Sequence, residues 1–187
     1  MNKNFIKILR PGINTTFQDL GRNNLCHIGI PFSGAMDNRN FLLSNKLVKN
    51  NLNTPVMEFA YQGPHLKYHG EKLNIAITGD VSFKIKKKKE IINGSCYESY
   101  LLEDNDEIDV YSTNKSVYGY LALGAELDLK FQWESCSINT RANIGSNSGK
   151  KISAGQEFYI KKINKDHSKK KISYINTKIE KIRVLQG

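Results

Sequence analysis

No run of about eighteen apolar residues occurs in the 187 residues of this chain, which excludes a conventional membrane-spanning helix. The opening residues 1–7 contain no apolar core of a secretory signal. A Met-Lys-Met biotin-attachment sequence is also missing. These absences predict a cytoplasmic protein without a membrane partner.

Cysteine is scarce as well. Cys26, Cys96 and Cys136 are odd in number, lie far apart and form no Cys-x-x-Cys pair, so they predict neither a disulfide framework nor a zinc site. His65 and His69 are four positions apart, but a preceding proline and strand-like surroundings remove the helical face that metal binding needs. We therefore predict no metal, and a reduced cytoplasmic setting.

Arginine supplies only 5 of the 28 basic residues, although the net charge is +10. The excess lies in two lysine tracts, 86–89 and 161–187, the second with nine basic against two acidic residues. No aromatic residues interleave with these lysines for base stacking, so we predict no nucleic-acid partner. In a chain that prefers lysine, Arg22 and Arg141 indicate places where a planar, bidentate cation is required.

Short segments of strand character, separated by Gly, Asn and Asp turns, predict a mainly β fold, either a barrel or a sandwich. One helix is expected, from residue 38 to about 49, with Asp37 as its N-cap, and it would cover the end of a small closed barrel. The expected strands cover residues 5–10, 56–61, 66–69, 73–78, 81–85, 97–102, 107–111, 117–123, 137–141 and 157–163.

The composition changes at residue 161. Residues 161–171 are rich in lysine and predict an exposed linker, whereas residues 174–185 regain β character and predict a terminal strand. We therefore divide the chain into a barrel domain, residues 1–160, and a basic linker with the start of a second half, residues 161–187.

Residues 15–37 hold the densest set of groups suited to binding and proton transfer, interspersed with backbone-punctuating Gly and Pro. We interpret Arg22 as a bidentate holder of a carboxylate or phosphate, with Asp19 orienting it or accepting an amide N–H. His27 titrates near neutrality, so it is the first candidate for proton transfer.

The backbone N–H groups of Ser33, Gly34 and Ala35 are candidates for stabilising an oxyanion or binding substrate. Asp37 has two interpretations, a helix cap or a catalytic ligand contact. For all these residues the alternative is a hydrogen-bonded loop at the end of the barrel, which needs many of the same polar groups.

The sequences TTFQDLGR (15–22) and GIPFSGAMD (29–37) resemble the opening signature of the allophanate hydrolase subunit 2 family. That family includes the C-type subunit of 5-oxoprolinase, KipA-type proteins and one part of the carboxyltransferase domain of urea carboxylase. The resemblance implies a cyclophilin-like β-barrel, and its segments 75–79 and 135–141 place Thr78 and Arg141 among the predicted substrate-binding residues. Further similar segments are 45–50, 57–59, 63–66, 120–125 and 149–156.

Three functions follow from this resemblance. The first is the C-type subunit of an ATP-dependent 5-oxoprolinase, which works with A-type and B-type subunits and with ATP bound in the complex. The second is a carboxyltransferase part that moves a carboxyl group from carboxybiotin to urea or a related amide, and the third is a regulatory protein of the KipA type. The lack of biotin and carboxylase modules favours the first.

The last residues, 182–187, look like the family's mid-chain segment, which ordinarily continues into a second half. We therefore expect the active cleft to be incomplete in this chain alone, with a separate chain supplying the second half. The alternative is a truncated product.

Overall fold

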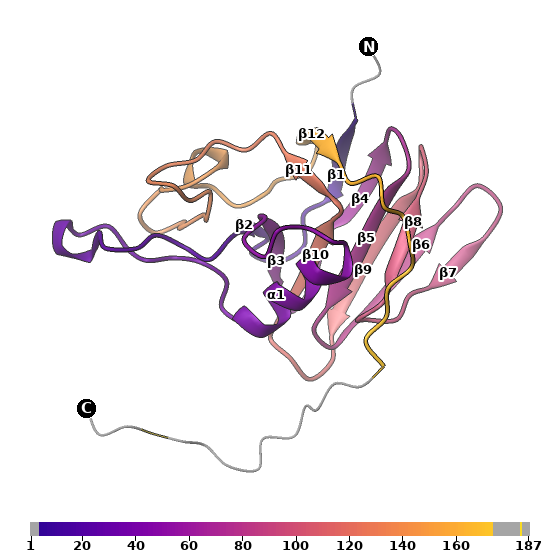
Figure 1. Ribbon diagram of the computed structural model, residues 1–187, viewed down its shortest axis with the longest axis horizontal. Helices are drawn as coiled ribbons and strands as arrows, with labels where there is room; N and C mark the ends of the chain where they lie inside the picture. Colours follow the sequence, from indigo (N-terminus) through magenta and orange to yellow (C-terminus); the bar gives the residue numbers. More distant parts are fainter. Residues whose placement is uncertain (1–3, 174–183, 185–187) are drawn as a thin grey trace.

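The computed structural model describes residues 4–173 and Val184. Their strands form two antiparallel sheets, with one α-helix and two short 3-10 turns outside them (Figure 1). The seven-stranded sheet has the order β11 (Ala125–Leu127), β12 (Glu157–Ile163), β1 (Phe5–Arg10), β4 (His65–His69), β9 (Glu107–Thr113), β6 (Val81–Lys86) and β7 (Ile91–Asn93). The five-stranded sheet has the order β2 (Thr16–Gln18), β3 (Val56–Ala60), β10 (Tyr118–Leu123), β5 (Leu73–Thr78) and β8 (Ser99–Leu102).

The main core contains residues from both sheets. Met57 and Leu121 pair directly across β3 and β10, so their side chains share one face of the five-stranded sheet. There they join Ile6 and Leu66 of the other sheet in one buried cluster. Full burial of a side chain of this size contributes about 1.5–3 kcal/mol relative to exposure. This shared core holds the five-stranded sheet in place.

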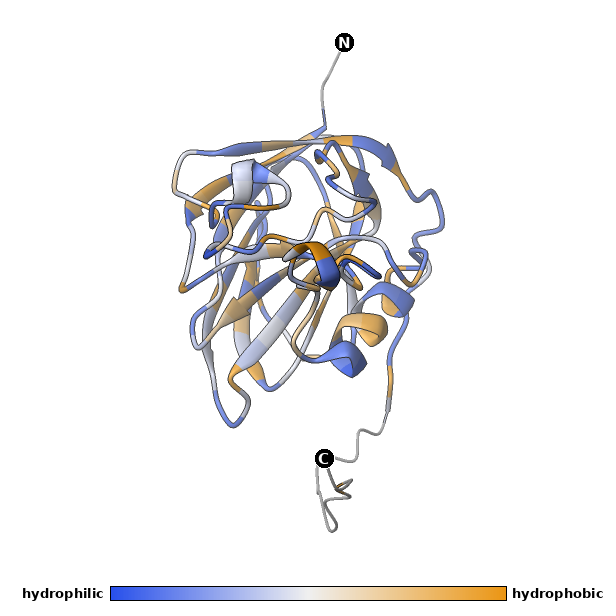
Figure 2. Ribbon diagram, turned by 90° about the vertical axis from the view of Figure 1, so that its left-hand side faces the viewer, coloured by the Kyte–Doolittle hydropathy of each residue, from blue (hydrophilic) through white to orange (hydrophobic). Residues whose placement is uncertain are grey.

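Helix α1 (Asn38–Leu47) packs on the other face of the five-stranded sheet. Its Phe41 and Leu47 form a second buried cluster with Val56 and Ala122. Figure 2 shows both orange and blue turns on this helix, as expected when one face packs against a sheet. Within the described part of the chain, no helix is long and apolar enough to cross a membrane.

The connection between β2 and α1 extends away from the sheets at the left of Figure 1. It contains the first 3-10 turn, η1 (Cys26–Ile28). The second, η2 (Asn147–Gly149), lies in the long segment between β11 and β12. These two irregular segments supply most of the side chains discussed below.

The mainly β prediction with one helix is confirmed, and β1, β5 and β12 have the predicted bounds. The predicted closed barrel is not confirmed, because the strand orders are those of two sheets, neither of which closes on itself among the described residues. The strand expected at residues 137–141 is wrong. Only an isolated bridge between Asn139 and Ile144 forms there, because Ser137 and Ile138 hydrogen-bond to Asp19 and Phe17 instead.

The exposed lysine-rich linker expected from residue 161 is not confirmed either. Strand β12 continues to Ile163, and the chain beyond it is hydrogen-bonded along the edge of β8. Ser99 donates its N–H to the carbonyl of Lys170 at 2.8 Å, and Ile172 donates its N–H to the carbonyl of Tyr97 at 2.9 Å. The lysine side chains point outward while the backbone covers a sheet edge. The expected strand at residues 174–185 lies outside the described residues, apart from Val184.

Candidate functional site

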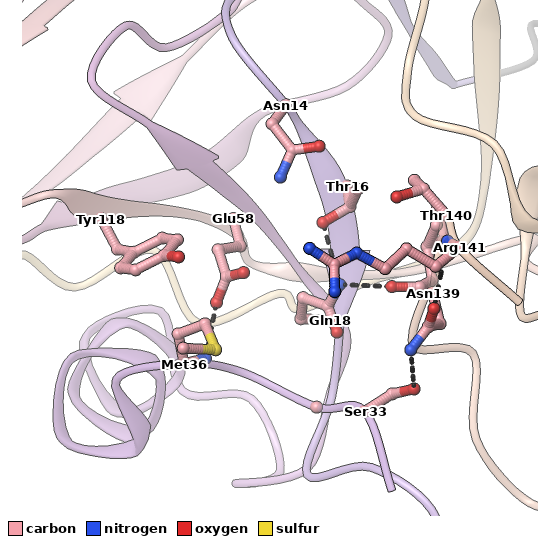
Figure 3. Close-up of a pocket in the computed structure, with 12 residues that line it drawn as sticks. Asn14, Thr16, Gln18, Ser33, Met36, Glu58, Tyr118, Asn139, Thr140 and Arg141 are labelled. Atoms are coloured by element: carbon pink, nitrogen blue, oxygen red, sulfur yellow. Dashed lines mark hydrogen bonds between the residues drawn. The ribbon is translucent and has the colours of Figure 1, made fainter. Parts of the chain in front are cut away.

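A pocket of about 460 Å³ opens on the helix-bearing face of the five-stranded sheet (Figure 3). Strand β2 contributes Thr16 and Gln18 to its wall, and β3 contributes Glu58. Asn14 before β2 and Tyr118 of β10 also line it, together with two loops. Ser33, Gly34 and Met36 come from the connection before α1, and residues 138–141 come from the segment after β11.

The position of Glu58 follows from strand register. Thr16 of β2 pairs with Glu58 of β3, Glu58 pairs with Tyr120 of β10, and Tyr120 pairs with Thr78 of β5. Residues directly opposite one another in antiparallel strands share a face. A row of polar side chains therefore crosses the helix-bearing face of the sheet. Met57, next to Glu58 in β3, points to the opposite face and into the core.

Glu58 is 6% exposed, and its carboxylate is held by two donors. Its Oε2 accepts the backbone N–H of Met36 and the hydroxyl of Tyr120, both at 2.8 Å. Desolvation by burial raises the pKa of the Glu58 carboxyl, and the two hydrogen bonds oppose this rise because they stabilise the ionised form. The Tyr120 oxygen in turn accepts the N–H of Asp37 at 2.7 Å, which links the pocket to the start of α1.

Gln18 has a fixed side-chain orientation. Its Nε2 donates to the carbonyl of Ile138 and to Thr16 Oγ1, each at 2.9 Å. A carbonyl can only accept, so the nitrogen must face Ile138 and the oxygen must point elsewhere. That oxygen, Oε1, is buried and has no hydrogen-bond partner among the described residues.

Asp19 lies beneath the pocket and is only 1% exposed. Its carboxylate accepts four hydrogen bonds, from the N–H groups of Gly21 and Cys136 at 2.8 Å and from the hydroxyls of Ser135 and Ser137. We predicted that Asp19 accepts an amide N–H group, and in the structure the backbone N–H groups of this chain are the donors. The geometry is that of a buried brace between two loops.

Arg22 is also 1% exposed, and its guanidinium bonds to backbone carbonyls. Its Nη2 donates to Ser137 at 2.9 Å and to Ser135 at 3.3 Å, and its Nε donates to Gln132 at 3.2 Å. Burial lowers the pKa of the guanidinium, while the nearby charge of Asp19 opposes that shift. Arg22 therefore shares partners with Asp19, below the pocket wall.

The predicted backbone-donor loop does line the pocket through Ser33 and Gly34. The N–H of Ala35, however, donates to the carbonyl of Asp19 at 3.0 Å, so it is occupied within the chain. Gly34 has φ +90°, and a Cβ atom there would lie 3.0 Å from the backbone nitrogen of Gly21. This position requires glycine both for its backbone angle and for the close approach of the two turns.

The remaining predicted residues occupy different places. His27 is exposed in η1, on the projecting connection, and does not line the pocket. Asp37 is confirmed as the N-cap of α1, because its Oδ1 accepts the N–H of Asn40 at 3.0 Å. Thr78 is buried and donates its hydroxyl to the carbonyl of Asn40 at 2.7 Å. Arg141 is exposed and lines the pocket.

Sequence reasoning missed Glu58 and Gln18 as site residues. One signal was available for Glu58, a single carboxylate inside the otherwise apolar strand VMEFA, which is buried throughout. A buried carboxylate costs free energy unless it is paired, so its presence in such a strand indicates a specific environment. Within the described residues, no group of three or more His, Cys, Asp or Glu side chains is arranged to hold a metal ion.

The fold and pocket define a two-sheet β protein with a polar, carboxylate-bearing pocket on one face of the five-stranded sheet. The chain belongs to the carboxyltransferase domain family, subdomains A and B, which it matches over residues 28–187. This confirms the relationship that the motifs in residues 15–37 indicated.

Two kinds of curated protein are similar to it. Urea amidolyase of Saccharomyces cerevisiae is 30% identical over 156 residues, which is 83% of this chain and 8% of that protein. The C-type subunit of the Haemophilus influenzae 5-oxoprolinase is 30% identical over 153 residues, which is 82% of this chain and 48% of that protein. The chain therefore spans about half the length of the latter.

Among solved structures, Kluyveromyces lactis urea carboxylase superposes with a TM-score of 0.79 at 28% identity, covering 86% of this chain and 14% of that one. The relatives are subunits of multi-subunit enzymes or parts of larger fused proteins, so this chain is related to components of larger enzyme assemblies.

Proposed function

We propose that this chain is part of an ATP-dependent 5-oxoprolinase, as a portion of its C-type subunit. One observation carries the proposal. The pocket combines hydrogen-bonding groups suited to an amide, Gln18 and Glu58, with an exposed guanidinium, Arg141, on its lining. The substrate 5-oxoproline is a cyclic amide that bears a carboxylate, and guanidinium groups bind carboxylates bidentately. The similarity to the C-type subunit of the Haemophilus influenzae enzyme supports the same assignment.

In this proposal the complex hydrolyses 5-oxoproline to glutamate in the cytoplasm. A-type and B-type subunits are the partners, and ATP is bound in the complex. Residues 1–160 serve as the substrate-facing domain. Glu58 replaces His27 as the candidate for the central polar group, because it lies in the pocket whereas His27 lies on the projecting connection.

A second candidate is a carboxyltransferase that uses carboxybiotin and acts on urea or a related amide. The family match and the similarity to urea amidolyase favour it. The pocket serves this reaction equally well at the amide, but urea carries no carboxylate for Arg141 to hold. The two candidates therefore differ in what Arg141 contributes.

The test is to purify the full protein with A-type and B-type subunits. ATP turnover is then measured with 5-oxoproline, and carboxyl transfer from carboxybiotin is measured with urea. Under the proposal, 5-oxoproline stimulates ATP turnover, and Arg141→Ala lowers kcat/KM by at least about tenfold, or about 1.4 kcal/mol. Exposed Lys130 provides the control, Lys130→Ala, with unchanged kinetics.

A folded complex in which 5-oxoproline does not stimulate ATP turnover would contradict the proposal. Carboxyl transfer to urea in that complex would instead establish the second candidate. Neither activity in a folded complex would leave a regulatory role of the KipA type.

A further inference from the structure

The geometry points to a specificity rule for the pocket: it selects amides that carry an N–H group, which is received by Glu58 Oε1 and Gln18 Oε1. We infer that amides substituted on nitrogen are rejected. This inference rests on the proposed function, because it concerns the same pocket, but it makes a separate claim about the class of ligand.

The first support is the asymmetry of the Glu58 carboxylate. Two donors, the N–H of Met36 and the hydroxyl of Tyr120, both bond to Oε2. Oε1 has no hydrogen-bond partner among the described residues, and Glu58 lines the pocket. In the ionised carboxylate, which these donors stabilise, Oε1 is an acceptor that a ligand in the pocket can use. An amide N–H is such a donor.

The second support is the orphaned oxygen of Gln18. This side chain is 5% exposed, and its Nε2 bonds fix its orientation. Leaving Oε1 unpaired costs about 1–3 kcal/mol, which an incoming N–H group would recover. The oxygen is buried, so a ligand reaches it once a side chain of the pocket lining moves outward.

The third support is the relative placement of the two acceptors. Thr16 pairs directly with Glu58 across the strands, and Gln18 lies two residues further along the same face of β2. Diagonal neighbours of this kind have their Cα atoms about 7–8 Å apart, with the side chains closer. Figure 3 shows both side chains in the pocket between the two loops. In this arrangement the single N–H of a small cyclic amide would be shared between the two oxygens as a three-centre hydrogen bond.

The substitution Glu58→Gln gives a sharp test, because its geometry is predictable. The position of Oε2 receives two donors, so the amide oxygen of the introduced glutamine must occupy it and the NH₂ group must face the pocket. The variant keeps the bonds to Met36 and Tyr120 but presents a donor where the native chain presents an acceptor. A site that hydrogen-bonds a substrate N–H discriminates strongly against analogues that lack it, and the variant loses that discrimination.

The experiment measures binding of 5-oxoproline and of N-methyl-5-oxoproline to the full chain by calorimetry. The native chain should bind 5-oxoproline at least about tenfold more tightly, and this preference should disappear in Glu58→Gln and in Gln18→Leu. The control is Glu107→Gln, which removes a carboxylate of β9 outside the pocket and should keep the preference. Melting temperatures establish that each variant is folded.

Equal affinity for the two probes, an unchanged preference in folded Glu58→Gln, or no binding of either probe would each overturn the inference. The experiments distinguish failure of this inference from failure of the proposed function. If the chain shows the N–H preference but 5-oxoproline does not stimulate ATP turnover in the complex, the inference stands and the proposed function is wrong. If 5-oxoproline stimulates turnover but the chain shows no preference, the proposed function stands and the inference is wrong.

Discussion

Asp19 and Cys136 are 117 positions apart in the sequence, yet the carboxylate Oδ2 of Asp19 accepts the backbone N–H of Cys136 at 2.8 Å. This bond joins the turn after β2 to the segment after β11, and these two irregular segments lead into the two loops of the pocket. The rigidity of the pocket therefore depends on a buried carboxylate that does not line it.

The first prediction concerns this brace. Asp19→Ala should lower the free energy of unfolding by at least about 3 kcal/mol, because it leaves buried donors of Ser135, Cys136 and Ser137 without an acceptor. Urea denaturation measures the loss. Asp128→Ala is the control, since Asp128 is 61% exposed in an ion pair with Lys161 and should change stability by less than about 0.5 kcal/mol. Loss of activity in Asp19→Ala with unchanged stability would instead indicate a catalytic role.

The second prediction separates backbone strain from steric clash. Gly34 and Gly155 both have positive φ, +90° and +83°, but only at Gly34 does an added Cβ meet neighbouring backbone. Gly155→Ala should cost about 1–2 kcal/mol from the left-handed conformation alone. Gly34→Ala should cost more than Gly155→Ala and should also weaken binding in the pocket, because the turn at Gly21 must shift. Similar costs at both positions would show that the close approach contributes little.

The third prediction concerns the pH dependence of stability. The pKa of Glu58 is raised in the folded chain above its ordinary value of 4.5, so the folded state binds the proton more tightly than the unfolded state. This contribution to stability is fully present below the unfolded pKa and is lost as the pH rises through the folded pKa. Relative to Glu58→Gln, the native chain should therefore lose stability from about pH 4 upward, by at most about 1.4 kcal/mol per pH unit.

Urea denaturation of both proteins at a series of pH values between about 4 and 8 measures this difference. A difference in unfolding free energy that stays constant across the series would show that Glu58 has the same pKa in both states.

The fourth prediction concerns the segment that covers the β8 edge. Glu98 is 8% exposed and forms ion pairs with Lys169 and Lys171. Glu98→Gln should weaken this attachment and speed amide hydrogen exchange at Ser99, whose N–H bonds to the carbonyl of Lys170. Lys170→Ala is a matched control, because Lys170 bonds to Ser99 through its backbone only. Equal exchange rates in the native chain and Glu98→Gln would contradict the prediction.

Much of the local structure could be predicted from the sequence because it depends on local rules. The short run of residues 73–78, which is typical of a buried strand, indicated β5, and the side chain of Asp37 identified the start of α1. The arrangement in two open sheets could not be predicted, because it depends on pairings between distant strands such as β1 and β12. Segment 137–141 was misjudged for the same reason, since Ser137 bonds to Asp19 and Ile138 to Phe17, both more than a hundred positions away.

The site was predicted in part. Ser33, Gly34 and Arg141 do line the pocket, because loop composition signals binding. Asp19 and Arg22 were predicted as catalytic and substrate-binding residues, and only the three-dimensional structure shows that both are buried and bonded within the chain. Glu58 and Gln18 lie in strands, where sequence alone does not tell which face of a sheet carries a pocket.

The pairing of Thr16 with Glu58 bears on how this pocket tolerates evolutionary change. Strand side chains alternate with a period of two, so a one-residue shift of β3 would turn Met57 outward and bury Glu58 in the core. Substitutions on the pocket lining can adjust ligand preference one contact at a time. Insertions and deletions within β3 exchange the two faces together, and should therefore be far rarer among functional homologues than changes in loop length elsewhere.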